Sequence, residues 1–283
     1  MKLKLSCTDF SFPLLEHDRA LGVIALLGFR GADIGLFEGH GHLKPSRELK
    51  KPARSGTALK RKLAAHGLKA SDIFLQIHAG FAEFAVNRPE TKHREFAREH
   101  FLRALDYANA AGAEHVTILP GVTFENEPRA ASISRSADEL AWRAGRAKAA
   151  KLQLAVEPHV GSLVDTPERA LDLVKRVPGL GITLDYAHFT RAGISDARIE
   201  PLAQFATHLH ARAARRGRLQ SLLKENTIDF PRGLAALNKN KFAGWIALEY
   251  VWIDWEHCNE VDVVSETILL CDQLVRAAGK INS

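Results

Sequence analysis

The sequence contains only three cysteines, and none of them belongs to a Cys-x-x-Cys pair. Cys7, Cys258 and Cys271 are scattered and odd in number, which argues against a disulfide framework or a zinc ribbon and predicts reduced thiols. No run of about 18 apolar residues is present, so no membrane span is predicted. The first seven residues alternate as in a strand and lack an apolar signal core, and we therefore expect a cytoplasmic protein.

Several sequence motifs for nucleotide binding and nucleophilic catalysis are also missing. No Gly-x-Gly-x-x-Gly or Walker A loop follows an apolar run, which weakens a doubly wound open sheet. No Gly-x-Ser-x-Gly is present, so nucleophilic hydrolase chemistry has little support. The net charge of +6 permits attraction to nucleic acid. The basic residues, however, are spread over helix-like segments, so we expect solvated helix faces and no nucleic-acid partner.

Eight short apolar runs alternate with helix-like segments along the 283 residues. Runs that are apolar on both faces are typical of a covered parallel sheet, and eight alternations predict an α/β protein with one (β/α)8 TIM barrel over residues 1–283. Thr166 followed by Pro167 predicts a helix start. Helices are expected at 92–111, 134–150, 167–176 and 262–278. Strands are expected at 2–7, 31–35, 73–78, 115–119, 152–157, 181–185, 205–210 and 245–250.

Metal-binding side chains end four consecutive predicted strands. They are Glu157, Asp185, His210 and Glu249, on the fifth to eighth strands. Because the carboxyl ends of barrel strands meet at one mouth, these side chains are expected to converge there. A single carboxylate there could equally be an ion-pair partner, for example of Arg212. The four together favour a divalent metal with three oxygen ligands and one nitrogen ligand.

Other histidines are expected near the same mouth. His188 follows Asp185 by three residues and either binds the metal or contacts a substrate oxygen. His208 shares a strand face with His210 but lies deeper, so we interpret it as a core residue or a support for the ligands. His159 faces inward, toward substrate or a neighbouring carboxylate. His78 ends the third predicted strand and faces the same mouth.

The loops around the mouth leave further alternatives open. Arg212, Arg215 and Arg216 follow His210 and either hold substrate oxygens or face water. Trp252 and Trp255 follow Glu249 and either form an apolar wall for a sugar ring or pack beneath the last loop.

A polar, basic stretch at 39–56 is expected to be a loop over the mouth. Its histidines, His40 and His42, are expected to face solvent.

Four motifs resemble the sugar phosphate isomerase/epimerase family, the xylose isomerase-like barrels. They are Val156-Glu157-Pro158-His159, Leu184-Asp185-Tyr186-Ala187-His188, His208-Leu209-His210 and Ala247-Leu248-Glu249-Tyr250. The resemblance covers nearly the whole chain. It implies one divalent metal ion, Mn, Co or Mg in preference to Zn, held by Glu157, Asp185, His210 and Glu249. It also implies that Glu157 and Glu249 form the acid/base pair and that His188 and Arg216 hold substrate oxygens.

The resemblance implies a sugar or keto-sugar isomerase or epimerase that removes a proton next to a carbonyl through a metal-stabilised enediolate. A dehydratase or lyase on the same site, a non-catalytic sugar-binding subunit and an endonuclease IV-like phosphodiesterase are the alternatives. The last class adds histidine ligands and an Asp-x-His pair, whereas residues 117–121 contain no histidine and no Asp-x-His precedes Ile228. The expected partner is a small sugar, and relatives often form dimers or tetramers.

Overall fold

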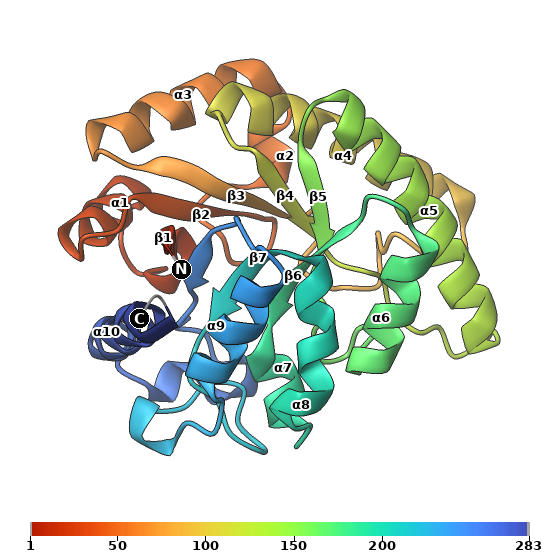
Figure 1. The fold of residues 1–283 in the computed structure, drawn as a ribbon. Coiled ribbons are helices and arrows are strands. Elements are labelled where there is room, and N and C mark those ends of the chain that lie inside the picture. The colour runs from red at the N-terminus through yellow and green to blue at the C-terminus, as the bar shows by residue number, and fades with distance from the viewer. Residues whose placement is uncertain (1, 282–283) are drawn as a thin grey trace.

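Eight parallel strands form a closed barrel in the computed structural model, which describes residues 2–281. Each strand pairs with its neighbours in sequence, and β1 closes the ring by pairing with β8. Helices surround the barrel (Figure 1), so the predicted (β/α)8 fold is confirmed. The strands are β1 Leu5–Thr8, β2 Gly31–Phe37, β3 Lys69–Gln76, β4 His115–Ile118, β5 Gln153–Val156, β6 Gly181–Asp185, β7 Ala206–Ala211 and β8 Ile246–Leu248.

Long helices follow most strands and cover the outside of the barrel (Figure 1). The α-helices are α1 His17–Leu26, α2 Pro45–Glu48, α3 Pro52–Ala65, α4 Thr91–Ala111, α5 Arg129–Ala149, α6 Pro167–Arg176, α7 Tyr186–Arg191, α8 Asp196–Ile199, α9 Phe230–Lys239 and α10 Val263–Ile281. Short 3-10 helices are η1 Asp9–Ser11, η2 Glu200–Phe205, η3 Leu223–Glu225 and η4 Trp255–Glu260. None of the helices within residues 2–281 combines the length and apolar character needed to span a bilayer.

Helix ends follow the local signals in the sequence. The Thr166 side chain accepts a hydrogen bond from the Arg169 backbone N–H, so it caps α6 as predicted. Asp229 caps α9 in the same way, through the Arg232 N–H. Gly112 ends α4 with a φ of 78°, a left-handed conformation that glycine adopts without steric cost.

The stretch at 39–56 is not one long loop, contrary to the expectation. It contains α2 and the first turn of α3, and a proline, Pro45 or Pro52, stands in the first turn of each helix. Proline is well tolerated there because the first N–H groups of a helix have no intrahelical partner. The basic composition of this stretch obscured these two start signals.

Polar side chains fill part of the barrel interior. Thr117 and Thr183 share a hydrogen bond of 2.6 Å, and His115 Nδ1 lies 2.7 Å from Asp72 Oδ1. These hydrogen bonds offset part of the cost of removing the buried groups from water. The paired groups form a polar floor beneath the mouth of the barrel, where the predicted site residues lie.

Candidate metal centre and active site

The four predicted ligands come to the same mouth of the barrel. Asp185 ends β6 and pairs in register with His210 on β7, whereas Glu157 and Glu249 stand one residue beyond β5 and β8. Backbone hydrogen bonds continue past both strand ends: Glu157 N donates to Ile118 O at 3.1 Å and Glu249 N donates to Ala211 O at 3.0 Å. All four side chains are buried, with at most 4% of their surface exposed.

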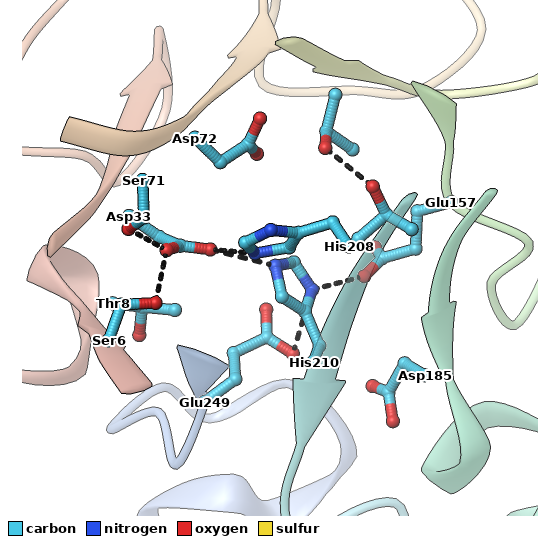
Figure 2. Close-up of polar contacts among 12 residues, drawn as sticks. Ser6, Thr8, Asp33, Ser71, Asp72, Glu157, Asp185, His208, His210 and Glu249 are labelled. Atoms are coloured by element: carbon cyan, nitrogen blue, oxygen red, sulfur yellow. Dashed lines mark hydrogen bonds and ion pairs between the residues drawn. The ribbon is translucent and has the colours of Figure 1, made fainter. Parts of the chain in front are cut away.

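His210 lies at the centre of this cluster. Its Nδ1 is 2.6 Å from Glu157 Oε1 and 3.5 Å from Glu249 Oε2, and its Nε2 is 3.3 Å from Asp33 Oδ2. Figure 2 shows the ring between Asp33 on one side and Glu157 on the other. Burial alone would lower the pKa of His210, but the carboxylates of Glu249 and Glu157 outweigh it and hold that pKa well above its usual value.

Asp33 is a functional neighbour that the sequence analysis missed. This β2 residue accepts hydrogen bonds from Ser6 and Ser71 on Oδ1 and from His208 on Oδ2, the last at 2.5 Å. Burial would raise the pKa of Asp33, but the imidazoles of His208 and His210 hold it well below the usual range. In the sequence, the signal for this role is an aspartate inside an otherwise apolar strand. In the structure, Asp33 fixes the orientation of both histidine rings.

Arg212 supplies the main positive charge at the mouth. Its Nη2 lies 2.6 Å from Asp185 Oδ2 and 3.0 Å from Glu249 Oε2, and its side chain is 4% exposed. Two of the four predicted ligands, Asp185 and Glu249, therefore form the ion pair with Arg212 that was the alternative to metal binding. These carboxylates raise the pKa of Arg212 even against burial, so the guanidinium is charged.

Two of the buried carboxyl groups have pKa values above the usual range. Burial, with the neighbouring carboxylates of Glu157 and Asp185, raises the pKa of Glu249 to about 8, although Arg212 and His210 act in the opposite direction. Burial likewise raises the pKa of Asp185 against the effect of Arg212. Glu249 therefore titrates close to neutral pH, far above the usual range of a glutamate.

The donor set fits a divalent metal ion. Glu157, His210 and Glu249 offer ligand atoms that all lie within 4.8 Å of one another, and the buried Glu249 Oε2 faces Arg212 Nη2 at 3.0 Å and His210 Nδ1 at 3.5 Å. Asp185 does not join this trio; it groups instead with Glu157 and His188. Two carboxylates and an imidazole suit Mn²⁺, Co²⁺ or Mg²⁺ with open positions for substrate oxygens.

A pocket of about 430 Å³ opens above these residues. This volume is in the range of small-molecule sites. Glu157, His159, His188, Arg212 and Glu249 form its polar side. Gln76 and His40 also line it. Aromatic and aliphatic side chains form most of the remaining wall, which can contact a carbon skeleton and exclude water. They are Phe10, Phe37, Phe74, Phe81, Leu119, Val251, Ile253 and Trp255.

Two further histidines reach the pocket as expected. His159 Nδ1 lies 2.7 Å from Val160 O, and its buried Nε2 has no hydrogen-bond partner. Because Nδ1 donates to that carbonyl, Nε2 carries a free lone pair that can accept from a substrate hydroxyl. His188 Nδ1 accepts from the Val160 N–H, and its Nε2 lies 3.2 Å from Arg212 Nη2 and 3.5 Å from Asp185 Oδ2.

The structure does not bring Arg216 and Trp252 to the pocket. Arg216 is exposed and lies along Gly193 beside a separate surface hollow, and Trp252 is not among the residues that line the pocket. Arg212 and Trp255 line the pocket in their place. His78 lines an adjoining cavity, and His40 lies at the pocket rim.

Comparison with known proteins identifies the family. Residues 21–272 match the model of the xylose isomerase-like TIM barrel family. The chain belongs to this family. A search of curated proteins found no match.

Solved structures share the barrel at low sequence identity. D-psicose 3-epimerase from Clostridium cellulolyticum H10, solved with D-tagatose, is 16% identical with a TM-score of 0.76, covering 97% of this chain and 99% of that one. L-ribulose 3-epimerase is 17% identical with a TM-score of 0.76, covering 99% and 97%. AP endonuclease, family 2 from Brucella melitensis is 18% identical with a TM-score of 0.70, covering 96% and 99%. At these identities the likeness establishes the fold.

Proposed function

We propose that this protein is a divalent-metal-dependent isomerase or epimerase of sugars or keto-sugars. The observation that carries the proposal is the buried trio of Glu157, His210 and Glu249 at the base of a pocket of small-molecule size. Structural neighbours named as D-psicose and L-ribulose 3-epimerases support this substrate class. A small sugar is the proposed partner.

The proposed metal site uses Glu157, His210 and Glu249, with Asp185 as the fourth donor. When bound, a divalent cation supplies Lewis acidity, which polarises a substrate carbonyl and makes the neighbouring C–H more acidic. Asp33 orients His210 through its contact with Nε2.

Glu157 and Glu249 are the proposed acid/base pair. They stand at the ends of β5 and β8, and His210 Nδ1 lies near an oxygen of each, so both carboxyl groups are within reach of a substrate carbon bound at this point. One of the two carboxyl groups removes the proton from the substrate carbon and the other returns it. Return of the proton to the opposite face of the same carbon gives an epimer, and return to the adjacent carbon gives an isomer.

Substrate oxygens have partners in His159 and His188, while the apolar wall around Phe81 and Trp255 excludes water from the reacting carbon. The free Nε2 of His159 is the proposed acceptor for a substrate hydroxyl. A dry pocket of this kind strengthens each electrostatic contact and limits loss of the proton to solvent.

Proton exchange in D₂O tests the proposed function. Metal-stripped protein is reloaded with Mn²⁺ and incubated with a panel of ketoses and keto-sugars, and deuterium incorporation is followed by NMR and mass spectrometry. We expect metal-dependent exchange at the carbon next to the carbonyl, with a product of the same mass as the substrate after correction for deuterium.

Loss of water from the product would assign a dehydratase, and exchange that persists in EDTA would contradict the metal-dependent proposal. Cleavage of DNA with an abasic site, without exchange on any sugar, would instead favour a phosphodiesterase.

A further inference from the structure

The Arg212 guanidinium lies against two of the proposed metal ligands, Asp185 and Glu249. Its guanidinium contacts Asp185 Oδ2 through Nε at 3.1 Å and through Nη2 at 2.6 Å, and Nη2 is also 3.0 Å from Glu249 Oε2. The three side chains are at most 4% exposed. A buried guanidinium between two carboxylates neutralises charge that would otherwise be costly to bury.

Both oxygens of Asp185 are already engaged. Oδ1 accepts the Ala187 backbone N–H at 2.8 Å and caps α7, while Oδ2 is held by Arg212. This engagement agrees with the separation of Asp185 from the trio of Glu157, His210 and Glu249. With Oδ1 bonded to the Ala187 N–H, ligation of a metal ion through Oδ2 would put the ion in competition with the guanidinium.

A metal ion held by Glu157, His210 and Glu249 would also lie close to the Arg212 guanidinium, because both cations would contact Glu249. Two cations that share one carboxylate oxygen repel each other, and this repulsion is large in a water-poor site. The nearby exposed Arg216 has no such contact with these carboxylates. Competition between cations is therefore specific to Arg212 among the arginines that follow His210.

We infer that the Arg212 guanidinium is a built-in cation that holds Asp185 and Glu249 in the metal-free protein and competes with a divalent metal for both. This inference rests on the proposed metal site. It has two consequences: the protein keeps its fold when stripped of metal, and it binds metal more weakly than the same carboxylates would without the arginine.

A double-mutant cycle between Asp185 and Arg212 tests the inference. Mn²⁺ affinity is measured by calorimetry at one pH for wild type, D185N, R212M and the double variant, with R216M as a matched control. We expect R212M to bind Mn²⁺ at least about tenfold more tightly, because Asp185 becomes free to bind the metal. In the wild-type background, D185N should change Mn²⁺ affinity by less than about threefold. In the R212M background, the same substitution should change it by at least about tenfold. R216M should match wild type.

Thermal unfolding in EDTA supplies a second readout. R212M should unfold at a lower temperature than wild type, because Asp185 and Glu249 lose their buried counter-charge, and D185N should partly restore R212M. If R212M does not fold without metal, R212K takes its place; its ammonium lacks the planar fork, so a smaller gain in Mn²⁺ affinity is expected.

Two results would overturn the inference. One is weaker or unchanged Mn²⁺ binding in R212M, or in R212K where that variant replaces it. The other is an equal effect of D185N in both backgrounds, since Asp185 would then bind metal beside the arginine. Absence of Mn²⁺ binding in all the variants would refute the proposed metal site instead. In that case, additive effects of D185N and R212M on unfolding in EDTA would also refute the pairing.

Discussion

Glutamine in place of Glu249 is expected to lower epimer or isomer formation by at least about 100-fold. Glutamine keeps the size and most of the polarity of the side chain, but its amide cannot deliver or remove the proton. E157Q should cause a loss of similar size, because turnover needs a carboxyl group on each side of the reacting carbon. The measurement is product formation by NMR at saturating Mn²⁺, with a substrate found in the exchange panel.

E225Q is the matched control, because Glu225 is exposed on η3 and pairs with Arg215 away from the pocket. It should retain wild-type turnover. Deuterium exchange separates the two glutamates further: each variant should still exchange the proton that faces its remaining carboxylate. Wild-type turnover in E249Q at saturating Mn²⁺ would remove Glu249 from the acid/base pair.

Metal affinity is expected to rise steeply with pH. His210 has a pKa well above its usual value and Glu249 has a pKa of about 8, so in the absence of metal both groups bind protons in the pH range near neutrality. Each must lose its proton to become a ligand, and metal binding therefore releases protons. Between pH 6 and pH 8, Mn²⁺ affinity should increase by about tenfold per pH unit for each proton released.

Calorimetry in buffers with different ionisation enthalpies counts those protons directly. H210N removes the imidazole and should abolish most of the binding. The same raised pKa values predict how stability depends on pH. The metal-free protein binds more protons than the unfolded chain, so its free energy of unfolding falls as pH rises through these pKa values. A flat affinity from pH 6 to pH 8, with no proton release, would exclude protonated His210 and Glu249 as the groups displaced by metal.

The mouth of the barrel was predictable because strand ends are easily recognised. Each apolar run is short and bounded by polar residues, and the carboxyl ends of parallel strands meet on one side of the barrel. Glu157, Asp185, His210 and Glu249 could therefore be placed together from their positions in the chain alone. The offset of Glu157 and Glu249 from their strands by one residue does not change this result.

Side-chain direction beyond a strand end was not predictable in the same way. After β7 the chain turns: Arg215 N bonds to Arg218 O at 3.2 Å, and Gly217 has a φ of 78°. This turn directs Arg216 to the surface, while Arg212, still next to the strand, points into the mouth. The order of arginines in the sequence does not contain that turn geometry.

The loop after β8 gives a second example. Trp255 begins η4 and lines the pocket, whereas Trp252 does not line it, although both side chains are equally exposed. Both residues follow Glu249 closely and have the same chemistry, so only the path of the loop separates them. Asp33 was missed for a different reason, because its role depends on contacts with β7 that are 175 and 177 residues away in the chain.

Titration of metal-stripped protein with Mn²⁺ in a calorimeter tests the central claim most directly. The account predicts about one site per chain in wild type and no measurable site in H210N, at a pH where the wild-type affinity is high. Equal binding in both proteins, or no binding in wild type, would contradict a metal centre built on Glu157, His210 and Glu249.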